Sequence, residues 1–165
     1  MASEANPYSK YLGDQDPLQV IAKTPERVRN LFGQLGPQGQ EKTYAPGKWS
    51  AREIICHLAD CEVAFAFRLR QTLAEPNHVI QPFDQELWAK HYPSLDGAAA
   101  LSAFVALRAW NQALLKTISP EDFNIPAKHP ERGPMTFKTI VETIGGHDLN
   151  HLAQLEKIAS SGVSK

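Results

Sequence analysis

The chain has 165 residues, 42% of them hydrophobic, with 17 basic and 18 acidic side chains, which fits one domain over residues 1–165 with a polar N-terminal arm over residues 1–15. The net charge of −1, with no basic stripe, argues against nucleic acid as the main partner. No apolar run approaches the roughly 20 residues of a membrane helix, and the N-terminus lacks a signal-peptide core, so we expect no membrane partner and a cytoplasmic protein.

Apolar side chains at helical spacing predict two long helices in the first half of the chain. The first runs from about Pro17 to Leu35, and Gly36, Pro37 and Gly39 end it. The second runs from about Ala51 to Ala74. It begins at a capping box, in which the Ser50 and Glu53 side chains each accept a hydrogen bond from the other's backbone, and Trp49 stands where a hydrophobic staple would pack.

The second half of the chain predicts two further helices. A connection over residues 75–95 is long for a small bundle, and its large rings argue for an ordered loop with a helical turn around residues 84–90. The third helix starts near Asp96 and ends before Pro120. A proline-rich crossover over residues 121–134, with a tight turn at its end, leads to a fourth helix from the Thr136 cap to about Ser160. The predicted buried side of the third helix consists of Leu101, Phe104, Leu107, Trp110, Leu114 and Ile118.

No alternating pattern of convincing length indicates a β-strand, and no repeat at a fixed period is present. We therefore predict an all-α fold, an up-and-down four-helix bundle with long crossover loops. Two adjacent glycines inside the fourth helix, Gly145 and Gly146, each cost roughly 0.8–1 kcal/mol relative to alanine. They favour the close approach of a neighbouring segment over a local kink without function.

Histidines at helical spacing are the strongest indication of a functional site. His147 and His151 lie a turn apart on the apolar face of the fourth helix, and His57 lies on the apolar side of the second. Burying an unpaired polar group costs about 1–3 kcal/mol, and a shared divalent metal would satisfy all three rings. Three protein ligands leave coordination positions open for water or substrate, as in catalytic zinc sites.

Plainer interpretations stand beside this one. A single core histidine is more often hydrogen-bonded than a ligand, and Cys61, on the same face as His57, is more often a small core residue than a ligand or reactive thiol. Cys56 lies about 140° around the helix from Cys61, so no disulfide is expected. Asp60 and Asp84 are candidate catalytic residues, which would orient a ligand imidazole or act as a general base, or else lie on a solvated surface.

Four other side chains lie outside this cluster. Arg68 is a candidate anchor for an anionic substrate, although an arginine on a helix is usually solvated. The remaining histidines lie in loop-like, proline-flanked stretches and are expected at the surface. They are His78, His91 and His129.

The order and spacing of these segments resemble the DinB-like (damage-inducible) family and its bacillithiol- and mycothiol-dependent transferase relatives. The resemblance covers nearly the whole chain and implies a four-helix bundle with a divalent metal, usually zinc or nickel, held by three histidines. Those map to His57, His147 and His151. It also implies frequent homodimers, but no settled reaction. The segments that carry the resemblance are Thr24–Glu26, Pro46–Ser50, Glu53–Glu62, Pro82–Trp88, His129–Gly133 and His147–Leu155.

Three kinds of function compete. An enzyme with an open three-histidine site would use a small-molecule substrate, either by hydrolysis or by transfer or isomerisation with an activated low-molecular-weight thiol. A non-enzymatic metal-binding stress-response module would bind metal without turnover. A structural protein would use its histidines for hydrogen bonding alone.

Overall fold

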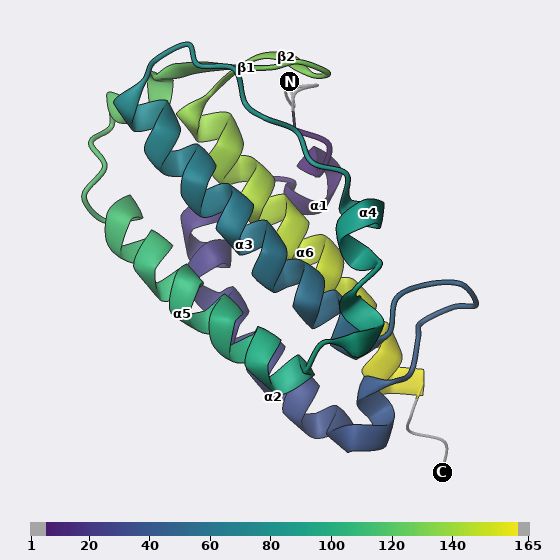
Figure 1. Ribbon diagram of the computed structural model, residues 1–165. Coiled ribbons are helices and arrows are strands. Elements are labelled where there is room, and N and C mark those ends of the chain that lie inside the picture. Colours follow the sequence, from purple (N-terminus) through teal and green to yellow (C-terminus); the bar gives the residue numbers. More distant parts are fainter. Residues whose placement is uncertain (1–5, 162–165) are drawn as a thin grey trace.

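The computed structural model describes residues 6–161, most of which are helical (Figure 1). Four long helices form the bundle, namely α2 (Pro17–Gln40), α3 (Ala51–Ala74), α5 (Gly97–Leu115) and α6 (Phe137–Ser161). The shorter elements are α1 (Ser9–Leu12), α4 (Gln85–Ala89), the 3-10 helices η1 (Tyr92–Ser94) and η2 (Asp122–Asn124), and the strands β1 (Pro126–His129) and β2 (Gly133–Thr136).

Local sequence signals set the helix ends. The Ser50 hydroxyl accepts a hydrogen bond from the Glu53 N–H, and the Glu53 carboxylate accepts one from the Ser50 N–H at 2.8 Å, so the predicted capping box is confirmed. Asp84 caps α4 by accepting hydrogen bonds from two of its backbone amides. Gly36, at φ 61° and ψ 177°, interrupts α2 where the sequence predicted its end, and the chain resumes helical turns as far as Gln40.

The predicted four-helix bundle with long crossover loops is confirmed. Successive long helices run in opposite directions, as the up-and-down prediction requires, except for α3 and α5. These two helices run parallel (Figure 1). A Cβ on Gly97 would touch Arg52 near the two N-termini, and Arg70 bonds Asn111 toward the two C-termini. The physical reason is the long connection between them, which runs back along the bundle and starts α5 at the same end as α3.

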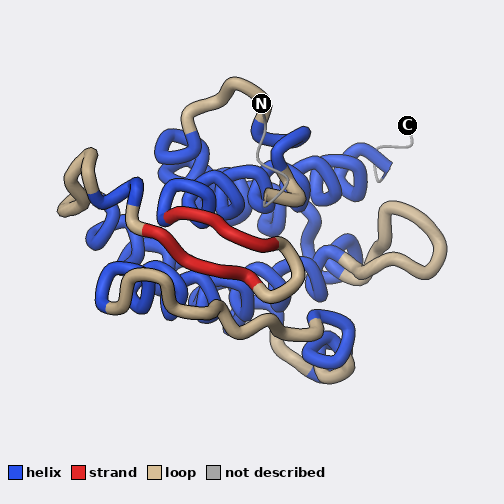
Figure 2. Tube along the Cα trace, turned by 90° about the horizontal axis from the view of Figure 1, so that it is seen from above, coloured by secondary structure: helices blue, strands red, loops and turns tan. Residues whose placement is uncertain are grey.

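A two-stranded antiparallel hairpin lies across one end of the bundle (Figure 2). Its register runs from Pro126 opposite Thr136 to His129 opposite Gly133, and Gly133, at φ 79°, permits the turn. The tight turn was predicted, but the absence of strands was wrong. Four-residue strands that each contain a proline carry too little alternation to be recognised.

Two large hydrophobic clusters at opposite ends of the bundle form most of the core, and a small third cluster contains Cys56, Ala89 and Tyr92. One gathers around Phe137, Ile144 and Leu69, and the other around Phe104, Leu152 and neighbouring residues of α3. Along α6, residues 147–151 therefore fall between the two clusters. This placement puts polar side chains in the middle of the bundle.

Helix α5 differs from its prediction on one face. Trp110 is 64% exposed, whereas Arg108, two residues earlier, is fully buried. The buried stripe is confirmed at Phe104 and wrong at Trp110, because ion pairs turn Arg108 inward. By length and composition alone, α5 is apolar enough to cross a membrane, a weak indication that core helices also give. The sequence analysis expected no apolar run of that length, and α5 is an exception to this expectation.

Candidate metal centre

The three predicted histidines converge between α3 and α6. Each offers one ring nitrogen, and these nitrogens lie within 4.8 Å of one another. The Nε2 atoms of His57 and His147 are 3.0 Å apart, and the ring centroids of His147 and His151 are 4.4 Å apart. All three side chains are buried. The structure thus brings together the residues that helical periodicity had singled out.

The two glycines before His147 admit the N-terminal segment. A Cβ on Gly146 would lie 2.5 Å from the Tyr8 carbonyl oxygen, and one on Gly145 would lie 3.2 Å from the Pro17 Cα. The predicted close approach is confirmed. The edge of the Tyr8 ring meets His147, with centroids 5.1 Å apart and planes at 87°. The sequence signalled through its glycines that something approaches here, but not that Tyr8 does.

Aromatic rings enclose the histidines. The centroid of the Trp49 ring lies 4.6 Å from that of His57 and 6.5 Å from that of His151. Phe65 meets His147 edge-on at 5.7 Å. Trp49 also packs on the core cluster that contains Ile54, as the staple prediction required. These rings surround the histidines with apolar surface, which lowers the local dielectric constant.

All three imidazoles are neutral at neutral pH. Burial lowers the pKa of His57 to about 3, with a smaller contribution from His151. Burial lowers the pKa of His151 to about 4, although its bond to Gln154 opposes the shift. Burial also holds the pKa of His147 well below 6.5, assisted by the two other histidines and by Arg108. Neutral imidazole is the form that binds metals, because its unprotonated nitrogen carries a lone pair.

His151 is oriented as a ligand. Its Nδ1 lies 2.8 Å from the Gln154 side-chain oxygen. That oxygen only accepts hydrogen bonds, so Nδ1 carries the proton and Nε2 the lone pair. Within the described chain this buried Nε2 has no hydrogen-bond partner. An orphaned nitrogen beside two convergent imidazoles fits a divalent transition metal such as zinc or nickel, for which imidazole is a suitable ligand.

Cys61 borders the cluster without joining it. Its Sγ is 3.4 Å from the His57 Nε2, while the group of mutually close ligand atoms comprises the three histidines. Burial raises the pKa of the Cys61 thiol, which keeps it protonated. Cys56 and Cys61 are both free, so the prediction of no disulfide between them is confirmed.

The two predicted catalytic carboxylates are engaged elsewhere. Asp60 accepts a hydrogen bond from the Tyr92 hydroxyl at 2.9 Å, and Asp84 caps α4. Neither bonds to a histidine within residues 6–161. Their catalytic roles stay predictions.

The three remaining histidines differ in their exposure to solvent. His91 is exposed, as predicted, whereas His78 and His129 are buried, so the prediction for these two was wrong. The hairpin explains the difference, because Val79 bridges Lys128 and binds the loop after α3 to β1. A flanking proline marks a loop but does not show whether another segment covers it.

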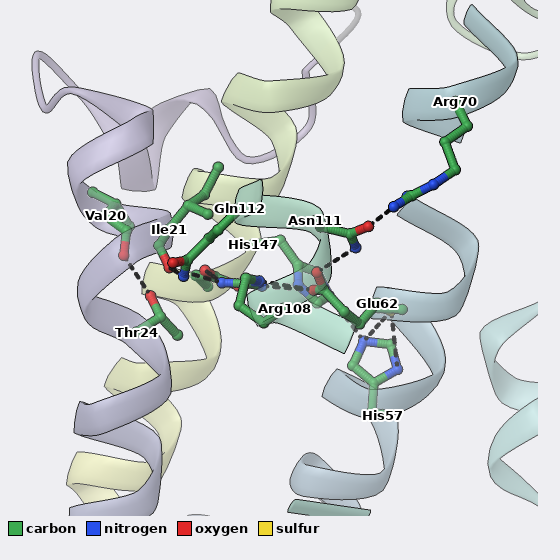
Figure 3. A network of polar contacts seen from close by, with 12 residues as sticks. Val20, Ile21, Thr24, His57, Glu62, Arg70, Arg108, Asn111, Gln112 and His147 are labelled. Atoms are coloured by element: carbon green, nitrogen blue, oxygen red, sulfur yellow. Dashed lines mark hydrogen bonds and ion pairs between the residues drawn. The ribbon is translucent and has the colours of Figure 1, made fainter. Parts of the chain in front are cut away.

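A buried ionic network, which the sequence analysis missed, lies beside the histidines (Figure 3). The Arg108 guanidinium on α5 pairs with Glu62 on α3 at 2.8 Å and with Asp148 on α6 at 2.6 Å. Asn111 donates to the second Glu62 oxygen at 2.7 Å, and Arg70 donates to the Asn111 oxygen at 2.6 Å. The available signal was Arg108 itself, the single charged residue of α5.

Two cavities reach the cluster from different sides. One, of about 310 Å³, is lined by Trp49, His151 and Gln154. The other, of about 280 Å³, is lined by Cys61 and His147. Tyr8 and Gln85 line both cavities. His147 and His151 therefore each line a cavity large enough for a small molecule.

The fold is a four-helix bundle, and its three clustered histidines are buried but lie next to two cavities. These two features define the class of protein. Residues 21–155 match the DinB superfamily, and the chain belongs to that family. A protein of Oceanobacillus iheyensis named “Putative metal-dependent hydrolase” is 31% identical over 142 residues, which cover 86% of this chain and 83% of that relative. “Putative metal-dependent hydrolase YfiT” of Bacillus subtilis is 23% identical over 145 residues, covering 86% and 82%.

The fold is shared with a solved structure. YfiT from Bacillus subtilis, described as having an unusual four-helix bundle topology, superimposes with a TM-score of 0.82 at 21% identity, over 96% of this chain and 89% of YfiT. At that identity the likeness concerns the fold.

Proposed function

We propose that this protein is a metal-dependent enzyme in which His57, His147 and His151 hold a divalent ion, zinc or nickel, that activates water or a low-molecular-weight thiol. The observation that carries the proposal is the convergence of three buried, neutral imidazoles, one with an orphaned nitrogen. Most buried side-chain polar atoms in proteins have a hydrogen-bond partner, so a nitrogen without one supports a ligand role for His151. The names of the relatives support metal-dependent hydrolysis, and the resemblance to thiol-dependent transferases supports thiol transfer.

The chain's own residues prepare the site for this chemistry. A divalent ion held there would act as a Lewis acid. It would lower the pKa of a bound water or thiol toward neutrality. Gln154 fixes the tautomer of His151. Trp49, Phe65 and Tyr8 limit the water around the rings. The cavities on either side admit a small-molecule substrate to the cluster.

Metal analysis of protein purified without a histidine tag tests the proposal. We expect stoichiometric metal in the native chain and its loss in His151→Ala and His147→Ala. His91→Ala, at an exposed histidine, is the matched control and should retain the metal. Equal metal in His151→Ala and the native chain would contradict the proposed ligand set.

Turnover separates an enzyme from the alternative, a non-enzymatic metal-binding stress-response module. Metal-loaded protein should hydrolyse activated esters or amides, or conjugate a low-molecular-weight thiol to an electrophile. Metal binding without either activity would favour the module.

Asp60 and Asp84 are kept as candidate general bases. Asparagine preserves the hydrogen-bond acceptor of each, and it is also a good N-cap in place of Asp84. Asp60→Asn or Asp84→Asn should therefore leave the chain folded and, where the carboxylate is the general base, lower turnover by about 100-fold or more. Unchanged turnover would assign that carboxylate to structure alone.

We further propose a homodimer in the cytoplasm. Exposed apolar side chains on two adjacent parallel helices support the dimer, namely Val63 and Phe67 on α3 and Trp110 on α5. Light scattering of the native chain and of Phe67→Ser tests it, since a dimer held by this face should dissociate in the variant. Cell fractionation tests the location.

A further inference from the structure

The cavity beside His147 is lined by basic side chains. Arg68 of α3 and Arg132 of the hairpin turn line it together with His129, and the buried Cys61 and His147 belong to the same lining. The hairpin and α3 are far apart in sequence, so the tertiary fold assembles this group. None of these basic residues is needed to hold the proposed ion.

In the described part of the chain, no ion pair neutralises the two arginines of this cavity. Neither Arg68 nor Arg132 forms an ion pair within residues 6–161, whereas Arg27, Arg52 and Arg108 each do. The one carboxylate in the lining belongs to Glu131, which is exposed. Two guanidinium groups facing one cavity repel each other, and an anion between them would remove that repulsion.

Arg68 is held in place rather than free in solvent. Its Nη2 donates to the Gln81 carbonyl oxygen at 3.2 Å, and its guanidinium lies over the Phe83 ring, 5.5 Å from the centroid. Burial and then the charge of Arg132 lower its pKa, yet arginine remains protonated in proteins. The guanidinium is thus a fixed, partly desolvated cation, which is the form that binds oxyanions most strongly.

His129 adds a neutral donor. Its Nδ1 accepts the Glu131 N–H at 3.2 Å, so in the neutral ring Nε2 carries the proton. Burial, Arg132 and Arg68, in that order, lower the pKa of His129, with Glu131 opposing them. The ring therefore contributes an N–H donor, for which no partner is found in the described part of the chain.

We propose that this cavity binds an oxyanion group, a carboxylate or a phosphate, through Arg68, Arg132 and His129. The further claim that this group belongs to the substrate rests on the proposed function. The anionic group would lie beside His147, with the rest of the molecule directed to the histidine cluster. The cavity thereby defines the substrate class as small acids or phosphorylated compounds.

Titration calorimetry with simple probes tests the site. Acetate, inorganic phosphate and the uncharged acetamide are titrated into both metal-free and metal-loaded protein. We expect acetate or phosphate to bind and acetamide not to bind. Charge-assisted hydrogen bonds of this kind predict that Arg68→Gln or Arg132→Gln weakens binding about ten-fold or more. Arg68→Lys should fall between the native chain and Arg68→Gln, because lysine keeps the charge but loses the planar fork.

Arg29→Gln is the matched control, since Arg29 is exposed on α2, outside the residues that line the cavity. Arg132 is exposed on the hairpin turn, so its variant should fold even if Arg68→Gln does not. Tighter binding of acetate than of phosphate identifies a carboxylate, and the reverse order identifies a phosphate. Equal binding of acetamide, or unchanged affinity in both arginine variants, would overturn the inference.

The titrations of metal-free protein distinguish a failure of this inference from a failure of the proposed function. An anion that binds only with metal present, and equally well in the arginine variants, binds the ion and not this cavity, which would overturn the inference. Anion binding in a chain that takes up no metal would support the cavity and refute the metal-dependent function.

Discussion

Two buried polar clusters stand side by side in this bundle and are satisfied in opposite ways. Arg108 bonds to both Glu62 and Asp148, and Asn111 bonds to the remaining Glu62 oxygen, so that cluster is complete within the protein. In the histidine cluster three neutral rings crowd together and the Nε2 of His151 lacks a partner. The comparison separates a cluster whose polar groups are all satisfied within the protein from one that leaves a buried nitrogen without a partner, as the proposed metal site requires.

The clusters share helices, because α3 and α6 each contribute to both. His147 and Asp148 are consecutive in α6, yet one is a neutral ring and the other belongs to an ion pair. The Arg108 charge also helps to hold the pKa of His147 down. The structural cluster therefore both joins three helices and favours the metal-binding form of its neighbour.

The largest expected effect breaks the complete cluster. Arg108→Met leaves Glu62 and Asp148 buried without their counter-charge, and removing one partner of a buried ion pair costs about 3–5 kcal/mol. Urea denaturation should show a loss of this size in the free energy of unfolding. Arg29→Met, at an exposed arginine, should change it by at most about 0.5 kcal/mol. If Arg108→Met lost no more free energy of unfolding than this control, the structural role of Arg108 would be contradicted.

The next effect concerns pH and the incomplete cluster. The folded pKa values of His57 and His151, about 3 and about 4, lie below the ordinary value of 6.5. The unfolded chain therefore binds more protons, and stability falls as pH drops from 6.5 toward 4. The fall approaches about 1.4 kcal/mol per pH unit for each such histidine.

Denaturation of metal-free protein at several pH values measures this slope. In His151→Gln the slope should be shallower than in the native chain, whereas in His91→Gln it should be unchanged. Identical slopes in all three proteins would show that the buried histidines do not titrate as inferred.

A smaller effect sharpens the ligand assignment. Gln154→Leu removes the hydrogen bond to the His151 Nδ1, and the loss of such an outer-shell partner weakens metal affinity about 10–100-fold. Competition with a chromogenic chelator measures the change. Gln34→Leu, at an exposed glutamine of α2, should leave the affinity unaltered. Unaltered affinity in Gln154→Leu would mean that His151 needs no orientation.

The smallest effect compares one substitution at two glycines. Gly33→Ala, in open space on α2, should stabilise the protein by up to about 1 kcal/mol through helix propensity. Gly146→Ala places a Cβ 2.5 Å from the Tyr8 carbonyl oxygen. Overpacking that costs about 1–3 kcal/mol then outweighs the gain in propensity. Thermal unfolding should move in opposite directions for the two variants, and stabilisation by Gly146→Ala would contradict the close packing of Tyr8.

Sequence periodicity predicted which three histidines converge, because helix geometry is local. A spacing of four places His147 and His151 on one face, and the apolar neighbours identify that face as buried. The capping box at Ser50 set the start of α3 in the same way. These features depend on residues within a few positions of each other, so they can be found without knowing the neighbours in space.

Tertiary structure decided what no local pattern carries. The parallel course of α3 and α5 depends on where a long loop returns, and the burial of Arg108, His78 and His129 depends on which segments cover them. Tyr8 reaches His147 only because α1 packs on α6. Burial and charge pairing are properties of contacts between distant segments. The sequence therefore determined which faces of the helices are apolar and which carry histidine, while the packing of those faces decided which buried polar groups find a hydrogen-bond partner and which do not.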